Sequence, residues 1–487
     1  MTPSAMLETA PLGDDVPVVS LKIAASTLIT STAVEEGCEP ALLHRSLLER
    51  PHKVASASGN NLYLEDGRTI LDGCGGAAVA AIGHGNQEVI ADTLAQMQKV
   101  SYVHTISYTT SSAEDLAHCI LDPRDGFDPK LERAYFINSG SEANDAAMKC
   151  ARQYWYEKGE TQRKYFVSRR QAYHGATVGP MSISTNLARK IPYADILLPN
   201  VSFVSPAYAY QYQRDSETEE QFVARLLAEI DAEFQRLGPE NIISFIAEPV
   251  VGATSGCVPA PKDYFTGVRA LCDKYNILLH LDEVMCGMGR TGTYFAFEQE
   301  SVLPDLATIG KGLGGGYAPI AALLINGKIV DALRKGTSSF NHGHTYQAHP
   351  VTCAAALSVQ KIIRRDGLVA RCAVQGEKLE RMLRETLADS KYVGNVRGRG
   401  LFWGVEFVKD RKNRTPFDKS IGFGLRVQQA AFELGVALYP GAGTFDGVSG
   451  DHVLVMPSYT VTDDELTLMV DVLKKAYESQ ERYVDSL

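Results

Sequence analysis

The sequence contains no run of Lys and Arg, and its basic residues do not alternate with aromatic residues in the way that suits binding along a nucleic-acid backbone. Its 48 Lys and Arg are outnumbered by 58 Asp and Glu, which gives a formal net charge of −10. Nucleic acid is therefore not expected as a partner.

Paired cysteines are also lacking. The nine cysteines are odd in number and scattered, and none of them has C-x-x-C spacing. This pattern indicates neither a disulfide framework nor a zinc site, and it is typical of reduced, mostly buried thiols in a cytoplasmic chain. We therefore predict no metal site and a cytoplasmic location.

Long hydrophobic runs are the third absence. The longest nearly unbroken apolar stretch, residues 318–325, is far shorter than the roughly 20 residues that a membrane-spanning helix needs. Residues 1–17 carry acids and prolines instead of the basic start of a secretory signal. Neither a membrane partner nor secretion is expected.

The sequence is long, with 487 residues, of which 45% are hydrophobic and 22% are charged. This predicts one large domain with smaller lobes. We predict an N-terminal arm over residues 1–50, the first part of a small lobe over 51–75, a large domain over 76–340, and the rest of the small lobe over 341–487.

Short apolar runs alternate with amphipathic helical patterns through the large domain. This alternation predicts an α/β fold whose central sheet is mostly parallel and buried on both faces. Ligands of such sheets bind at the carboxyl ends of the strands. The runs cover residues 134–138, 164–168, 241–250, 276–282, 306–309 and 321–325.

The small lobe has a different pattern. Residues 61–72 alternate in hydrophobicity around Asp66-Gly67, which predicts a β-hairpin. After residue 340 the pattern predicts helices over 349–363 and 368–387, strands around 400–405, and a terminal helix from Asp463. We therefore predict an α+β lobe.

Lys311 stands just after the apolar run 306–309, separated from it by Gly310, and is followed by several glycines. Glycine lets the backbone or a flat ligand approach closely. A lysine among apolar neighbours can have a lowered pKa and act as a nucleophile toward an aldehyde. A surface lysine whose stem covers apolar neighbours is the alternative.

Asp282 closes the apolar run 276–282. A carboxylate at a buried strand end costs several kcal/mol unless it is paired with a cation or a donor, so we predict that Asp282 faces a group such as a protonated ring nitrogen. The alternative is an acid that ends a strand for solubility. Glu283 would point to the opposite face and is interpreted as structural.

A third candidate feature follows the apolar run 134–138. Ser139 and Glu142 have the spacing of a capping box, while Gly140 and Ser141 offer N–H groups and a hydroxyl at the positive end of a helix. This predicts a phosphate-binding cup, although a capped helix without a ligand has the same residues.

Tyr173 follows the run 164–168 and can stack on a flat ring, although a core tyrosine is the commoner meaning of a single Tyr. An amine that holds an aldehyde, an acid for a ring nitrogen, a stacking face and a phosphate cup are together what pyridoxal phosphate (PLP) requires.

At these residues the sequence resembles the class III (omega-type) aminotransferases of the fold-type I PLP enzymes. The resemblance covers the chain from about residue 60 to its end. The motifs, in the family's order, are S-G-S-E-A-N (139–144), Y-H-G (173–175), A-E-P (247–249), L-D-E-V (281–284) with G-M-G-R-T-G (287–292), G-K-G (310–312) and G-H-T-Y (343–346).

Carried over position by position, the resemblance implies that Lys311 holds the cofactor's aldehyde covalently and later moves the substrate's proton. It also implies that Asp282 bonds the ring nitrogen and that Gly140 and Ser141 hold the phosphate.

Two further roles follow from the same resemblance. Tyr173 would stack on the cofactor ring. Thr345 would reach the phosphate of the other subunit's cofactor, which implies a homodimer with shared active sites.

Two positions depart from the pattern of the family. Many relatives have a Gln that bonds the phenolic oxygen of the cofactor ring three positions after the ring-nitrogen Asp, where this chain has Met285. Relatives that use glutamate or 2-oxoglutarate pair the Glu of A-E-P, here Glu248, with an Arg whose position is occupied by Leu454. The chain therefore resembles the branch that transfers amino groups from amines or β-alanine to pyruvate.

The substrate side is assigned from the same resemblance. Arg397 and Arg399 are candidates for binding a carboxylate, with a structural role expected for at least one of them. The side chains predicted to line the substrate are Glu248, Tyr102, His104 and Tyr346.

The predicted function is a PLP-dependent aminotransferase working by ping-pong Schiff-base chemistry. An omega-amine or amino acid donates its amino group, and a small 2-oxo acid, expected to be pyruvate, accepts it. An aminomutase, a racemase or a decarboxylating transaminase would keep Lys311 and Asp282, and a non-catalytic cofactor-binding regulator is a further alternative.

Overall fold

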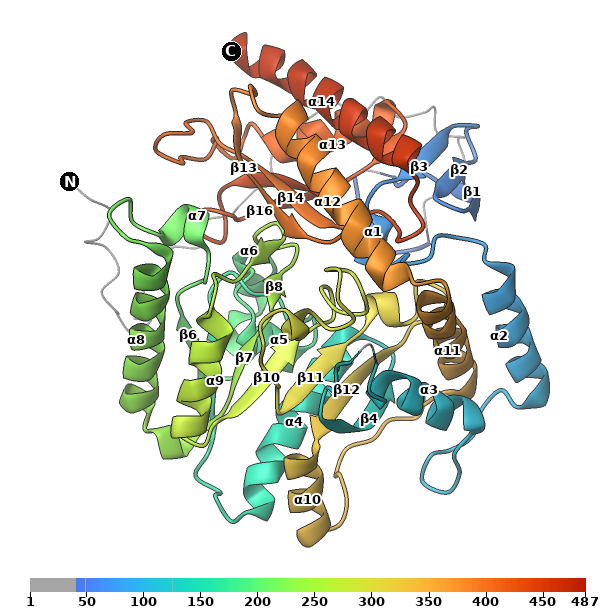
Figure 1. Cartoon of the computed structure of the whole chain (residues 1–487), viewed down its shortest axis with the longest axis vertical. Helices are drawn as coiled ribbons and strands as arrows, with labels where there is room; N and C mark the ends of the chain where they lie inside the picture. The colour runs from blue at the N-terminus through green and yellow to red at the C-terminus, as the bar shows by residue number, and fades with distance from the viewer. Residues whose placement is uncertain (1–40, 49, 125) are drawn as a thin grey trace. The chain divides into compact units, whose positions relative to one another are not determined.

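The computed structural model describes residues 41–48, 50–124 and 126–487 (Figure 1). The chain divides into two units, Met1–Pro51 and His52–Leu487, and every element below belongs to the second. The first 40 residues of the predicted arm lie outside the described part of the chain.

A seven-stranded sheet forms the centre of the large domain, in the order β4-β12-β11-β10-β7-β5-β6 (Figure 1). Only β12 runs antiparallel to both of its neighbours, β4 and β11, so the predicted α/β fold with a mostly parallel sheet is confirmed. The strands are β4 (Leu131–Ile137), β12 (Ala321–Asn326), β11 (Leu306–Ile309), β10 (Leu278–Asp282), β7 (Ile242–Ala247), β5 (Tyr165–Arg169) and β6 (Val201–Val204).

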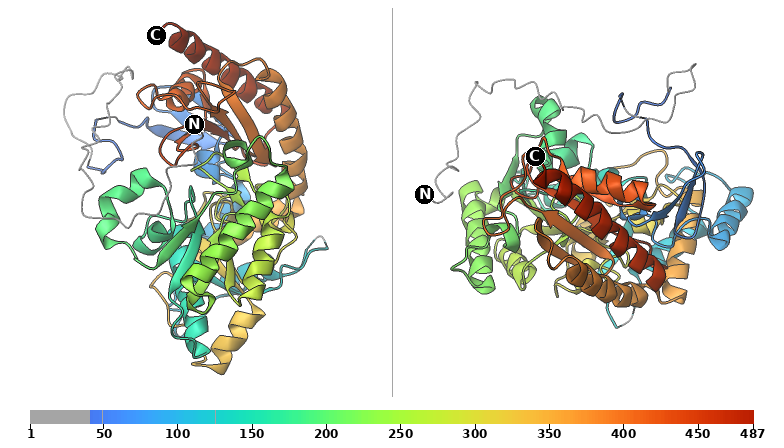
Figure 2. Two further views of the ribbon diagram at one scale, coloured as in Figure 1. Left: turned by 90° about the vertical axis from the view of Figure 1, so that its left-hand side faces the viewer. Right: turned by 90° about the horizontal axis from the view of Figure 1, so that it is seen from above.

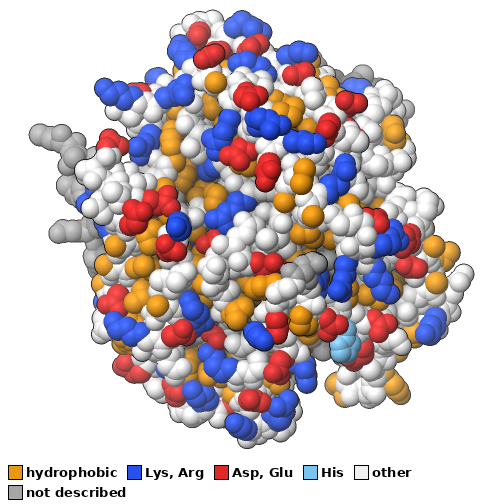
Figure 3. Space-filling model, viewed as in Figure 1, with side chains coloured by type: hydrophobic (Ala, Val, Ile, Leu, Met, Phe, Trp, Pro, Cys, Tyr) orange, Lys and Arg blue, Asp and Glu red, His pale blue; other side chains and the backbone are white. Residues whose placement is uncertain are grey.

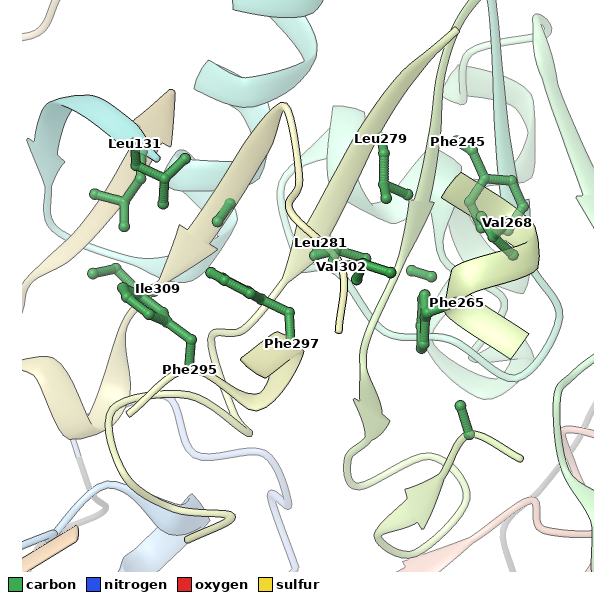
Figure 4. Packing of buried hydrophobic residues seen from close by; sticks show 14 of the residues in the cluster. Leu131, Phe245, Phe265, Val268, Leu279, Leu281, Phe295, Phe297, Val302 and Ile309 are labelled. Atoms are coloured by element: carbon green, nitrogen blue, oxygen red, sulfur yellow. The ribbon is translucent and has the colours of Figure 1, made fainter. Parts of the chain in front are cut away.

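Both faces of this sheet are buried. On β10, Leu279 and Leu281 join one hydrophobic cluster while Leu278 joins another, because successive side chains of a strand point to opposite faces. The first cluster includes the stacked rings of Phe295 and Phe297, whose centroids are 4.8 Å apart (Figure 4).

Helices contribute many of the other residues of each cluster. The helices α3 (Ser111–Leu121), α8 (Glu219–Leu237) and α9 (Tyr264–Lys274) pack into the first cluster. The helices α4 (Gly140–Glu157) and α10 (Gly327–Lys335) pack into the second. A sheet covered on both faces leaves the strand ends as the place for a ligand.

The small lobe contains two four-stranded sheets. One has the order β1 (Val54–Ser58), β2 (Asn61–Leu64), β3 (Thr69–Asp72) and β15 (Val436–Ala437), and its antiparallel pair β2–β3 is the predicted hairpin. The other has the order β13 (Val393–Arg399), β14 (Phe402–Phe407), β17 (Asp451–Val455) and β16 (Tyr439–Ala442).

The predicted helices of the small lobe are present as α11 (Pro350–Arg365), α12 (Leu368–Thr386) and α14 (Asp463–Asp485). The terminal helix α14 lies against α12 and α13 (Phe423–Glu433), as Figures 1 and 2 show. The α+β character of this lobe therefore agrees with the pattern of the sequence.

The remaining helices and strands are mostly short. They are α1 (Gly75–Ala78), α2 (Gln87–Lys99), α5 (Val178–Ile183), α6 (Leu187–Lys190), α7 (Ala209–Tyr212), β8 (Val250–Val251), β9 (Val258–Pro259) and the 3-10 turns Ile191–Ile196, Pro239–Asn241, Ala296–Glu298 and Lys311–Leu313.

Charges of both signs are mixed on the face shown in Figure 3, where blue Lys and Arg side chains lie among red Asp and Glu. Within the described ranges, no helix is long and apolar enough to cross a membrane. The same residues include no group of His, Cys, Asp and Glu placed to hold a metal ion.

Candidate active site

Asp282 is the last residue of β10, and the residue is 3% exposed. One carboxylate oxygen, Oδ2, lies 2.7 Å from His174 Nδ1 and accepts a hydrogen bond of 2.9 Å from Asn144 Nδ2. Burial raises the pKa of Asp282, but the hydrogen bond and charge of His174 outweigh it, so the pKa lies below its usual value. The carboxylate is therefore held as an anion.

Asn144 connects Asp282 to the neighbouring strand. Its Oδ1 accepts a hydrogen bond of 3.0 Å from Thr308 on β11, and the Thr308 hydroxyl lies 3.1 Å from His280 Nε2. All of these side chains are buried. The network fixes the direction of the Asp282 carboxylate, because each buried polar atom in it has a partner.

His174 and Asn144 stand inside the motifs quoted from the sequence, yet the sequence reasoning gave neither of them a role. The signal that could have found them is the rule that a buried acid needs a partner, because both are polar residues in the segments that come after strands of the same sheet. His174 comes after β5, and Asn144 lies in the first turns of α4, after β4.

Lys311 begins the turn that follows β11, and Asp282 pairs in register with Thr308 on that strand. The φ angle of Lys311, 44°, lies in the left-handed region, which lysine rarely adopts. Within the described part of the chain, its Nζ has no hydrogen bond or ion pair. Burial lowers the pKa of Lys311, against the charges of Asp282 and Glu248, which act to raise it.

Gly140 and Ser141 form the first turn of α4 as predicted. A Cβ on Gly140 would lie 2.6 Å from Val284 Cγ1, so only glycine allows this close approach. Ser141 Oγ accepts a hydrogen bond of 2.9 Å from the backbone N–H of Ala176. This contact joins the start of α4 to the loop that carries Tyr173.

The predicted capping box at this helix is only half formed. Ser139 Oγ accepts a hydrogen bond of 3.2 Å from the Glu142 N–H, as expected. The Glu142 carboxylate, however, accepts from the Ser139 hydroxyl at 2.9 Å rather than from the Ser139 backbone N–H. The second half of the box is therefore absent.

Tyr173 lies beside Glu248. Its backbone N–H donates a hydrogen bond of 3.2 Å to Glu248 Oε1, and its half-buried ring has the Arg189 guanidinium 5.4 Å from its centroid.

Leu454 is fully buried on β17, where it packs in one apolar cluster with Val250 and, at the edge of that cluster, Met285. The two positions at which this chain departs from the pattern of the family, Met285 and Leu454, therefore belong to one apolar cluster. The side chains of Met285 and Leu454 both offer apolar atoms to their surroundings.

The two candidate arginines are already paired. Arg397 donates a hydrogen bond of 2.6 Å to Glu406 and is 7% exposed, which is a structural role. Arg399 donates one of 2.5 Å to Glu300. A substrate carboxylate would have to compete with Glu300 for Arg399.

Tyr102 and Tyr346 lie together, with ring centroids 6.1 Å apart, and both are close to His349. Tyr346 is 56% exposed, and its neighbour Thr345 is also exposed. His104 is exposed in the same segment as Tyr102.

Comparison with known proteins identifies the family. The family described as Aminotransferase class-III matches residues 46–477. An uncharacterized aminotransferase of Schizosaccharomyces pombe is 43% identical over 93% of this chain and 98% of its own length. Gamma aminobutyrate transaminase 3, chloroplastic, of Solanum lycopersicum is 32% identical over 91% of this chain and 84% of its own.

Solved structures agree. An amine transaminase from an uncultivated Pseudomonas species in a PLP-bound form has a TM-score of 0.84 at 31% identity and covers 92% of this chain and 100% of its own. An omega transaminase from Pseudomonas jessenii in complex with PMP has a TM-score of 0.83 at 31% identity over 89% of this chain and 94% of its own. The chain belongs to the class III aminotransferases and is a PLP-dependent enzyme.

The residues on this sheet edge fit the cofactor. The Lys311 amine has no hydrogen-bond partner among the described residues, and its lowered pKa makes it available to an aldehyde. Asp282 is an oriented anion at a strand end, suited to a protonated ring nitrogen. Gly140 and Ser141 stand at a helix N-terminus, which favours a phosphate.

Proposed function

We propose that Lys311 is the residue that holds the PLP aldehyde and that moves the proton at the substrate's amine-bearing carbon. The lowered pKa of its amine favours the neutral form, which is the nucleophile and the base. When bound, the cofactor supplies an electron sink for the carbon that loses this proton.

Asp282 is proposed to bond the ring nitrogen and to keep it protonated. His174 and Asn144 occupy one of its oxygens, and the Val284 N–H donates a hydrogen bond of 3.1 Å to the other. These contacts orient the carboxylate before the cofactor arrives, so no rearrangement of the carboxylate is required.

The remaining cofactor contacts are proposed for three residues of the same sheet edge. Gly140 and Ser141 would bind the phosphate through the free N–H groups at the start of α4. Tyr173 would cover one face of the ring. We propose that this site lies on the large domain, residues 76–340, and that the small lobe, residues 51–75 and 341–487, lies beside it.

The acceptor is proposed to be pyruvate. The observation that supports this is the apolar pair Met285 and Leu454, which supplies no cation for a second carboxylate. Burying an unpaired carboxylate there would be costly. The donor is proposed to be an omega-amine or amino acid, in keeping with the names of the gamma aminobutyrate and omega transaminases to which the chain is similar.

Half-reactions of the pyridoxamine-loaded enzyme test the acceptor. We expect pyruvate to regenerate the aldehyde form at least about tenfold faster than 2-oxoglutarate. A tenfold ratio corresponds to a free-energy difference of about 1.4 kcal/mol. Absorbance in a stopped-flow instrument measures both rates.

The matched control is 2-oxopentanoate, which has the carbon chain of 2-oxoglutarate without its distal carboxylate. If charge is the cause, 2-oxopentanoate reacts faster than 2-oxoglutarate. A faster reaction of 2-oxoglutarate than of pyruvate would overturn the proposed acceptor.

A homodimer with shared active sites is also proposed. Ile90, Leu94 and Met97 follow one another along one face of α2 and are 45%, 53% and 54% exposed. Exposed apolar faces of this kind mark protein interfaces. Thr345, exposed in this chain, is proposed to bind the phosphate of the cofactor held by the partner subunit.

A further inference from the structure

His280 is a buried histidine on β10, two residues before Asp282. Side chains two residues apart on a strand point to the same face of the sheet, so His280 and Asp282 share a face. Leu278, on that same face, packs in one cluster with residues of α4. His280 lies outside the motifs quoted from the sequence.

The orientation of the Asn144 side-chain amide follows from its neighbours. Its Nδ2 donates a hydrogen bond of 2.7 Å to the backbone carbonyl of His174 and one of 2.9 Å to Asp282 Oδ2. The opposite orientation would place the amide oxygen against a carbonyl oxygen and a carboxylate, and neither of these groups has a proton to donate. Asn144 Oδ1 therefore faces Thr308.

The hydroxyl of Thr308 lies between Asn144 and His280, and it has a single proton. An amide oxygen only accepts, so this proton is donated to Asn144 Oδ1 at 3.0 Å. The same hydroxyl oxygen lies 3.1 Å from His280 Nε2, which must then donate in that contact. His280 is therefore held with its proton on Nε2.

His280 is also held neutral. Burial lowers the pKa of His280 to about 4, although the charge of Asp282 acts to raise it. A neutral imidazole has only one N–H group, so Nδ1 of His280 has no proton. The imidazole contributes an oriented donor to the network and no charge.

The three contacts form a chain in which every donor points toward Asp282. His280 donates to Thr308, and Thr308 donates to Asn144. Asn144 in turn donates to Asp282. Hydrogen bonds in such a chain polarise and strengthen one another. Donation to a carboxylate favours its charged form, so the chain acts on Asp282 in the same direction as its contact with His174.

We propose that His280 is a positioning residue that acts through Thr308 and Asn144 to keep the proton shared by Asp282 and the cofactor's ring nitrogen on the nitrogen. The inference rests on the proposed function, in which Asp282 bonds that nitrogen. The proton stays on the nitrogen while the carboxylate is the weaker base of the two, and donation from the chain weakens the carboxylate as a base.

Other titratable groups around Asp282 also affect its charge, and the substitutions of His280 and Thr308 used below leave them in place. They are His174 after β5, Glu248 after β7, Glu283 and Cys286 after β10, and Lys311 after β11. A difference between those variants therefore reports on the chain that starts at His280.

The tautomer of His280 is the first test, and it is independent of turnover. The full-length enzyme, with isotope-labelled histidine, is loaded with pyridoxine phosphate and studied by heteronuclear NMR. His280 should keep its proton on Nε2 and stay neutral at every pH above about 5. The signal is assigned by its loss in His280→Gln. A proton on Nδ1, or a charged imidazole above that pH, would overturn the inference.

The protonation of the ring nitrogen is the second test. Pyridoxine phosphate has the ring and the phosphate of the cofactor but no aldehyde, so Lys311 cannot react with it, and its ultraviolet absorbance changes when the ring nitrogen loses its proton. His280→Leu should lower the pH midpoint of this loss for the bound probe by at least about half a unit, which is a roughly threefold change in the protonation ratio. His280→Gln, whose amide can donate to Thr308, should restore most of the midpoint. An unchanged midpoint in His280→Leu would overturn the inference.

Thr308→Val tests whether His280 acts through Thr308. This variant removes the hydroxyl and should itself lower the midpoint, and adding His280→Leu to it should cause no further fall. If the two substitutions lower the midpoint additively, His280 does not act through the chain and the inference is wrong.

Asp282→Asn separates this inference from the proposed function. If Asp282→Asn lowers the midpoint and His280→Leu does not, the inference fails while the role of Asp282 stands. If Asp282→Asn leaves the midpoint of the wild type unchanged, the role proposed for Asp282 is itself wrong.

Discussion

Lys311 combines an unusual backbone conformation with a lowered pKa. Only the neutral amine attacks an aldehyde. We therefore expect the rate of PLP capture by the apoenzyme to rise with pH through a midpoint below the ordinary lysine pKa of about 10.4. Stopped-flow absorbance across a pH series measures this midpoint, and a midpoint at or above the ordinary value would contradict the lowered pKa.

Lys311→Ala provides the second part of this prediction. It should abolish covalent capture of the cofactor and transamination, because no other amine occupies its place. Appreciable turnover by the variant would exclude Lys311 from the reaction.

The chemical types at the site were readable from the sequence, but their pairings were not. Asp282 was identified because it ends an apolar strand, and Lys311 because it stands just after one. The partners of Asp282 lie 108 and 138 residues away along the chain, at His174 and Asn144. Contacts over such separations depend on which strands become neighbours in the sheet. The order of the strands cannot be predicted from the type of a single residue.

At the scale of the element, the buried strands were predictable because β7 and β10 consist largely of apolar residues that are buried on both faces. The direction of β12 was not, since a fully buried strand has the same composition whether it runs parallel or antiparallel. Short strands such as β6, which is only half-buried over most of its length, also gave no signal.

Helix α14 offers a test of local stability. Thr462 Oγ1 accepts from the Glu465 N–H at 3.2 Å, and Glu465 Oε2 accepts from the Thr462 N–H at 2.8 Å, so this capping box is complete. Thr462→Ala should lower the free energy of unfolding by about 1 kcal/mol. Urea denaturation measures the loss, and Thr462→Ser, which keeps the hydroxyl, should retain most of the stability. Equal losses in the two variants would rule out the cap as the cause.

At the scale of the whole molecule, the apolar face of α2 predicts association. Leu94→Glu should weaken the proposed dimer and reduce activity, because it places a charge on a face that would be buried between two chains. Sedimentation velocity measures the mass across a concentration series.

The cytoplasmic location, by contrast, stays a prediction from composition.

Leu468→Glu serves as the control for that experiment. Leu468 is 49% exposed on α14, a similar exposure on a different helix, and its substitution should leave the mass unchanged. A wild-type chain that sediments as an active monomer would remove both the dimer and the role proposed for Thr345.

The order of the central sheet has a consequence for the timing of synthesis. Strand β4, which leads into the Gly140 turn, reaches the other strands only through β12, and β12 comes last of the seven along the chain. Because the N-terminal part of a chain leaves the ribosome first, β4 waits unpaired for about 180 residues of further elongation, and the turn proposed to bind the phosphate follows it directly. We therefore expect a nascent chain to capture its cofactor only after residue 326 has emerged.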